Sequence, residues 1–173
     1  DYLRIFYGNT HGIVNVTVKS DGIAVLADTL KRGNGFNEIS AELYGGKDIL
    51  IEFTGNVSPD IYGTSIERRT GLILDNIPQR GSAGLEFTMV DRKNLTESYK
   101  ILAPDLFILH YGLNIVRNVR DDYSYYQKGL GRQLALLKEI SPDTRILVVS
   151  LTDMAIRVGD SIKPYRNIPT IIE

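Results

Sequence analysis

The stretch Pro104–Asn114, PDLFILHYGLN, indicates the fold of the second half of the chain. Within it, Leu106–Leu109 is an apolar run that is too short for a helix and follows a Pro-Asp turn. This pattern predicts a strand buried on both faces of a parallel sheet. Gly112 and Asn114 come just past its C-terminal end, at the edge where open α/β sheets bind ligands. Alternatively, Gly112 only turns the chain and Asn114 caps the next helix, as these residue types often do.

Apolar segments on either side of this stretch extend the pattern along the chain. Leu72–Asp75 and 146–151 predict two further buried strands, and helical periodicity predicts helices over about 88–103 and 123–140. The order strand, helix, strand, helix, strand is typical of a parallel sheet with right-handed crossovers. We therefore predict a partial α/β domain over residues 71–173.

Residues 1–70 have a different pattern, in which strands are short and no helical period appears. Val14, Val16 and Val18 alternate with polar residues, which is the period of a half-buried strand. Further short strands follow at a spacing of roughly ten residues, separated by Gly- and Asp-containing turns. We predict a β-sandwich, jelly-roll-like, over residues 1–70.

Composition narrows the function classes. The net charge of -1 in 173 residues offers no electrostatic footprint for nucleic acid or an anionic membrane. No apolar run approaches the roughly 18 residues that cross a bilayer. The absence of Cys excludes thiolate metal sites and a Cys nucleophile, and no cluster has metal-ligand spacing, so we expect no metal and no cofactor. Because residues 1–7 already have a strand pattern, we interpret the chain as a fragment or a processed piece.

Three loops follow the three predicted parallel strands and should emerge at one edge of the sheet. They are 76–84, 110–114 and 152–155. A backbone N–H of a Gly-rich loop and a side-chain carboxamide can together bind a developing oxyanion. Gly84 and Asn114 are the natural pair for this role. Alternatively, Gly84 occupies a helix N-cap position and binds no ligand.

Three other residues are weaker candidates for lining the site, namely Ser82, Gly112 and Asp153. Ser82 could be a nucleophile, but a turn hydroxyl is the simpler interpretation. For Asp153, capping of a loop or helix is the simpler interpretation.

The segment Asn76–Gly84, NIPQRGSAG, resembles the second block of the SGNH (GDSL-like) hydrolases, in which Gly84 would donate a backbone N–H to the oxyanion hole. The segment Tyr111–Asn114, YGLN, resembles the third block, whose Asn side chain is another donor. Asp75–Ser82 is similar to a branch of multidomain bacterial esterases that carry a carbohydrate-binding-like β-sandwich between the first and second blocks. By this resemblance, residues 1–70 are the insert and 71–173 are part of a flavodoxin-like SGNH domain.

The resemblance implies a serine esterase that removes acyl groups, with acetyl expected, from a polysaccharide or peptidoglycan. It also implies a periplasmic or extracellular location in a bacterium. The nucleophile and base blocks of the family are missing. Gly159–Ser161 spells Gly-Asp-Ser but lies after the third strand, and neither His11 nor His110 stands in an Asp-x-x-His block.

We therefore expect this chain alone to be inactive, because a Ser–His–Asp system needs all three groups within hydrogen-bond reach. A sheet that lacks the nucleophile strand should need complementation by another segment or chain. An alternative is a non-catalytic glycan-binding module on an α/β scaffold. A third is an assembly domain without a ligand.

Overall fold

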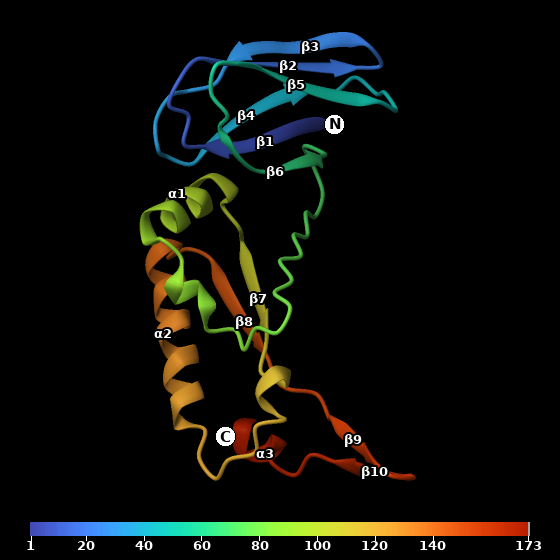
Figure 1. Cartoon of the computed structure of the whole chain (residues 1–173), viewed down its shortest axis with the longest axis vertical. Helices are drawn as coiled ribbons and strands as arrows, with labels where there is room; N and C mark the ends of the chain where they lie inside the picture. Colours follow the sequence, from blue (N-terminus) through green and yellow to red (C-terminus); the bar gives the residue numbers. More distant parts are fainter. Residues whose placement is uncertain (173) are drawn as a thin grey trace. The chain divides into compact units, whose positions relative to one another are not determined.

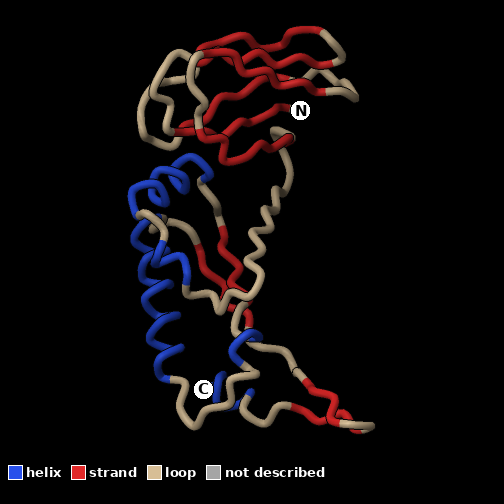
Figure 2. Tube along the Cα trace, viewed as in Figure 1, coloured by secondary structure: helices blue, strands red, loops and turns tan. Residues whose placement is uncertain are grey.

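The computed structural model describes residues 1–172. The chain has two compact units, which divide between Asn76 and Ile77. Most of the regular structure consists of strands in antiparallel sheets, with few helices, which is consistent with the predicted β-sandwich part (Figures 1 and 2).

In the first unit, whose residues are all described, six strands form two three-stranded antiparallel sheets. One sheet has the order β4-β1-β6 and the other has the order β3-β2-β5. The strands are β1 (Tyr2–Gly8), β2 (Val14–Ser20), β3 (Ile23–Thr29), β4 (Asn37–Glu42), β5 (Ile49–Gly55) and β6 (Asp60–Glu67).

A single apolar core joins the two sheets of the first unit. It contains the alternating valines of β2 that the sequence pattern singled out, together with Leu3, Ile5 and Tyr7 of β1. Because successive side chains of a strand point to opposite faces, each sheet contributes one apolar face to this core. The arrangement is consistent with the predicted β-sandwich.

The second unit combines helices with two small sheets in its described part. β7 and β8 pair in parallel and are connected by a segment that contains the helix α2. β9 and β10 form an antiparallel hairpin. The elements are η1 (Glu86–Met89), α1 (Arg92–Leu102), β7 (Leu106–His110), η2 (Leu113–Ile115), α2 (Ser124–Ile140), β8 (Arg145–Val149), β9 (Ala155–Val158), β10 (Ser161–Pro164) and α3 (Ile168–Ile172).

Local sequence explains where α1 begins and ends. The Asp91 carboxylate accepts a hydrogen bond from the Asn94 backbone N–H at 2.8 Å, which caps the first turn. At the other end, Ala103 adopts a left-handed conformation and Pro104 prevents the helix from continuing. Leu95 and Tyr99 then bury one face of α1 in a core shared with α2 and β7.

The prediction that Leu72–Asp75 is a buried strand is wrong. The segment is irregular, and the Leu72 side chain is 94% exposed. A strand is defined by its pairing, and no described strand pairs with this segment, which ends the first unit. An apolar run with no neighbouring strand to pair with remains irregular.

The prediction that the Leu106–Leu109 strand is buried on both faces is also wrong. Leu109 is 6% exposed and faces the helices, whereas Ile108 is 53% exposed on the opposite face. Leu147, which pairs with Ile108 in register, is exposed on that same face. The α1 and α2 helices therefore cover one face of the β7–β8 sheet, while the other face presents apolar side chains to solvent.

The chain after β8 contains structure that the sequence pattern did not predict. The hairpin of β9 and β10 turns at Gly159, whose φ of 60° lies in the left-handed region. The Gly-Asp-Ser tripeptide is thus the turn of this hairpin, with Ser161 at the start of β10.

Candidate functional site

Two of the three predicted loops meet at Ser82. The Asn114 side-chain amide donates a hydrogen bond to the Ser82 carbonyl oxygen at 2.6 Å, and the Gly84 backbone N–H donates to the Ser82 hydroxyl oxygen at 2.8 Å. The structure therefore brings Gly84 and Asn114 to the same residue, although they are 30 positions apart in the sequence. Both donors are engaged within the loop rather than aimed at one shared oxygen.

The backbone at Gly84 requires glycine. Its φ is 84°, and a Cβ built there would lie under 3.0 Å from atoms of the Tyr111 side chain. The loop therefore approaches the aromatic ring that immediately precedes Gly112. The 76–84 loop therefore packs closely against Tyr111, which directly follows β7.

A carboxylate organises the same loop from inside. Glu86 accepts hydrogen bonds from the Ser82 hydroxyl, from the Leu85 backbone N–H at 2.8 Å and from the Ala83 backbone N–H at 3.3 Å. Burial raises the pKa of Glu86, but these hydrogen bonds favour the ionised form more strongly, so the pKa lies below its ordinary value. Glu86 was not among the residues expected from the sequence, because its spacing from Ser82 matches no capping motif.

Ser82 itself has the environment of a structural hydroxyl. Its exposed fraction is 7%, and it donates to a carboxylate while accepting from Gly84. A serine nucleophile needs a nearby base that can take its proton, and its hydroxyl oxygen must be accessible to a substrate. No histidine bonds to Ser82 among the described residues, so the turn-hydroxyl interpretation fits its contacts.

Gly112 and Asn114 lie in a tight turn after β7. Gly112 has a φ of 103°, and a Cβ there would lie 3.2 Å from the Tyr126 hydroxyl oxygen and closer still to Leu151. Asn114 stands inside the short helix η2, whereas α2 begins only at Ser124. Asn114 therefore does not cap the next long helix, and its exposed side chain reaches back to the Ser82 loop.

The other predicted candidates lie elsewhere on the surface. Asp153 is exposed in the segment between β8 and β9, His110 is exposed at the end of β7, and His11 is exposed in the first unit. Within residues 1–172 there is no group of three or more His, Cys, Asp or Glu residues that could hold a metal ion. No described helix is long and apolar enough to cross a bilayer.

A buried amide near this region was not anticipated from sequence. Gln133 of α2 is fully buried, and neither its side-chain oxygen nor its nitrogen has a hydrogen-bond partner among the described residues. It stands one helical turn after Gly129, whose backbone packs against Leu85. Helical periodicity could have placed Gln133 on the inner face of α2, but not its lack of partners.

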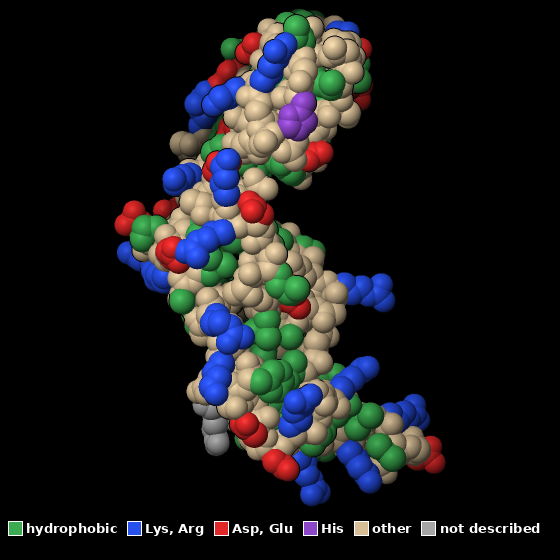
Figure 3. Space-filling view, turned by 60° about the vertical axis from the view of Figure 1, so that its left-hand side comes forward, with side chains coloured by type: hydrophobic (Ala, Val, Ile, Leu, Met, Phe, Trp, Pro, Cys, Tyr) green, Lys and Arg blue, Asp and Glu red, His purple; other side chains and the backbone are tan. Residues whose placement is uncertain are grey.

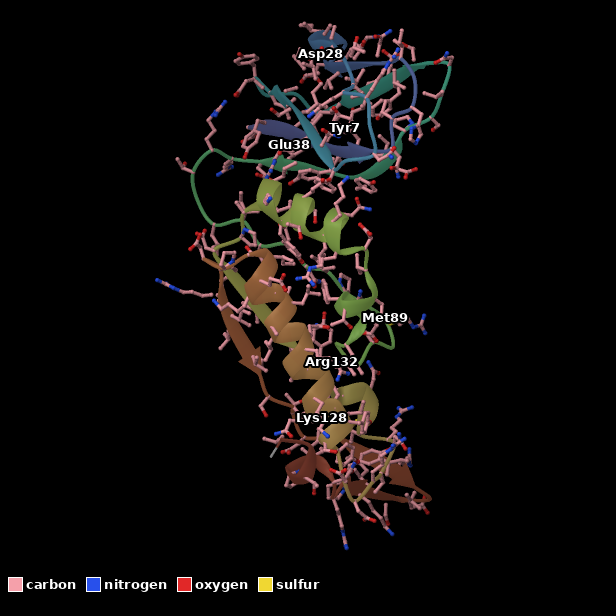
Figure 4. All side chains as sticks on the ribbon, turned by 90° about the vertical axis from the view of Figure 1, so that its left-hand side faces the viewer. Tyr7, Asp28, Glu38, Met89, Lys128 and Arg132 are labelled. Carbon is pink, nitrogen blue, oxygen red and sulfur yellow. The ribbon has the colours of Figure 1, made fainter. Side chains whose placement is uncertain are left out.

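The first unit carries a charged network on the face of β1 that points away from its core. The Arg4 guanidinium forms salt bridges with Glu38 at 2.7 Å and with Glu67 at 3.3 Å. The Tyr2 hydroxyl donates a hydrogen bond to the Glu67 carboxylate at 2.8 Å. These carboxylates raise the pKa of Arg4 above its ordinary value, against the effect of burial. Figure 4 shows Glu38 on β4, beside the β1 strand that carries Tyr7.

Figure 3 shows how charged and hydrophobic side chains are distributed on one face. On the face seen in Figure 3, Lys and Arg side chains are spread among Asp and Glu, and hydrophobic side chains gather between them on the second unit. This surface pattern does not single out a further site beside the Ser82 loop.

Comparison with known proteins adds no family assignment. No protein-family model matches the chain, and no curated protein matches it. The resemblance to SGNH hydrolases therefore depends on the quoted residues alone and stays a prediction.

Proposed function

We propose that the chain is part of a serine esterase of the SGNH hydrolase type, which removes acyl groups, acetyl foremost, from a polysaccharide or peptidoglycan. The observation that carries this proposal is the meeting of Gly84 and Asn114 at Ser82. These are the two residues whose motifs resemble the oxyanion donors of that family. No second pair of loops in the described residues brings such donors together at the end of a parallel strand.

In the proposed reaction, a serine from a block outside this sequence attacks the acyl carbon and passes its proton to a histidine. The carbonyl oxygen becomes an oxyanion, which accepts hydrogen bonds from the Gly84 N–H and the Asn114 amide. The tetrahedral intermediate collapses and releases the sugar hydroxyl, which takes the proton from the histidine. Water then hydrolyses the acyl-serine by the same steps.

The present contacts of the two donors indicate what must change for this reaction. An amide nitrogen carries two hydrogens, so Asn114 can donate to Ser82 and to a second acceptor at the same time. The Gly84 N–H has only one hydrogen, so a substrate oxygen would have to replace the Ser82 hydroxyl. The Ser82 loop would therefore rearrange by a small rotation when the site is complete.

We further propose that another segment or chain completes the sheet and supplies the nucleophile and base. Parallel sheets are usually covered on both faces, yet Leu106, Ile108 and Leu147 are exposed on one face of the β7–β8 pair. A polypeptide that adds strands beside this pair and a helical layer over its exposed face would complete a flavodoxin-like sheet. For such an enzyme we propose a periplasmic or extracellular location in a bacterium.

The second candidate function is a non-catalytic glycan-binding module. The sandwich of the first unit favours it, because the unit is compact and carries exposed aromatic side chains such as Phe53 and Tyr62. In this case the α/β unit would serve as scaffold.

The test compares this chain with a longer one from the same reading frame that includes upstream and downstream sequence. We expect the 173-residue chain not to hydrolyse p-nitrophenyl acetate above an albumin control, and Ser82→Ala to leave that result unchanged. The longer chain should release acetate, and replacing its Gly-Asp-Ser serine should abolish the release. A longer frame with neither Gly-Asp-Ser nor Asp-x-x-His would contradict the esterase proposal, as would turnover by the short chain that Ser82→Ala removes.

A further inference from the structure

An open hollow of about 360 Å³ lies at the end of the first unit, next to the connection between β5 and β6. Its volume falls within the range of roughly 300–1,000 Å³ that is usual for small-ligand sites. The hollow belongs entirely to the sandwich. Its lining residues are Val14, Phe53, Gly55, Asn56, Val57, Ser58 and Pro59.

Two strand residues contribute apolar side chains to the lining of the hollow. Val14 is buried, and Phe53 pairs in register with the buried Val16, so the Phe53 ring lies on the inward face of the sheet. Because β5 is an edge strand, this ring remains 37% exposed. An aromatic ring that is fixed by its strand and open on one side offers a flat apolar surface to a ligand.

The rim of the hollow is polar but uncharged. Asn56 and Ser58 are exposed on the connecting segment, and none of the lining residues is ionisable. The segment is held by a close approach to Gly12, where a Cβ would lie 2.8 Å from Val57 and 2.9 Å from the Asn56 side-chain oxygen. The rim is therefore packed against the neighbouring loop.

We infer that this hollow binds a neutral saccharide. The apolar C–H face of a sugar ring would stack on Phe53, while its hydroxyl groups would exchange hydrogen bonds with Asn56 and Ser58, each of which can both donate and accept. The absence of charge in the lining disfavours acidic or basic ligands, which would be desolvated without a partner. The inference rests on the proposed glycan-binding function and places the glycan-binding site in this hollow.

The experiment measures binding of xylohexaose and of the hexamer of N-acetylglucosamine to the full 173-residue chain by isothermal titration calorimetry. Phe53→Ala should weaken binding roughly tenfold, which corresponds to about 1.4 kcal/mol. Asn56→Ala should weaken it several-fold. Tyr44→Ala is the matched control, because Tyr44 is an aromatic residue of the same unit that is 89% exposed and does not line the hollow.

Loss of binding in Phe53→Ala and Asn56→Ala with retention in Tyr44→Ala supports the inference. Because Phe53→Ala could disturb the fold, Asn56→Ala and Ser58→Ala in the exposed connection provide the second readout, with circular dichroism as the check. Binding of neither saccharide, or equal binding by all variants, overturns it. Hydrolysis of p-nitrophenyl acetate by the longer chain does not depend on this hollow, so failure here and failure of the esterase proposal are separate results.

Discussion

Replacing Gly84 by Ala should destabilise the second unit strongly. The φ of 84° is unfavourable for an L-residue with a Cβ, which costs about 1–2 kcal/mol. The new methyl group would also overlap Tyr111, and overpacking of this kind typically costs about 1–3 kcal/mol. Together these terms predict a decrease of about 2–5 kcal/mol in the free energy of unfolding.

The assay is urea denaturation followed by circular dichroism at 222 nm, since the described helices all belong to the second unit. Gly131→Ala is the matched control. Gly131 lies within α2 with open space around its Cβ position, so alanine there should stabilise the helix by about 0.8–1.0 kcal/mol. If Gly84→Ala unfolds at the same urea concentration as the unmodified chain while Gly131→Ala shifts as expected, the described Gly84–Tyr111 packing is wrong.

Three further predictions concern the same unit. In an active longer chain, Asn114→Ala should reduce kcat by about 10²–10³-fold, which corresponds to a loss of about 2.7–4 kcal/mol of transition-state stabilisation. An unchanged kcat would show that Asn114 is not an oxyanion donor. Because the folded-state pKa of Glu86 is lowered from 4.5, its stabilising contribution should be complete above that value and lost as pH falls through the folded-state pKa. Thermal unfolding from pH 7 to pH 3 should then show Glu86→Gln less stable than the unmodified chain at pH 7, with the difference shrinking as the pH falls below 4.5; a difference that grows in acid would contradict this sign. Gln133→Met should raise the free energy of unfolding by about 1–3 kcal/mol, because it removes a buried amide without a partner. A lower melting temperature would instead show that a buried group or water satisfies that amide.

The sequence identified elements whose cause is local. The alternation of Val14, Val16 and Val18 predicted a strand, and the apolar period from Tyr126 to Leu137 predicted the helix that forms α2. Pro104 correctly marked the end of α1. Each of these signals acts within one or two turns or one strand, so neighbouring residues suffice to determine it.

The candidate site was only partly accessible to this kind of reasoning. The sequence selected Gly84 and Asn114 because each follows an apolar segment, and the structure connects both to Ser82. It could not show that the Gly84 N–H is already engaged, nor that Glu86 binds the Ser82 hydroxyl. These contacts depend on how two separate loops fold against each other.

Sequence by itself determined the two long helices α1 and α2, the strand alternation of the first unit and the residue types at the loop after β7. Tertiary structure alone decided that Leu72–Asp75 is irregular, that Ile108 is exposed while Leu109 is buried, and that Asn114 bonds the Ser82 carbonyl. The physical reason is that helical hydrogen bonds close within four residues, whereas a strand or a loop contact exists only when a distant segment supplies the partner.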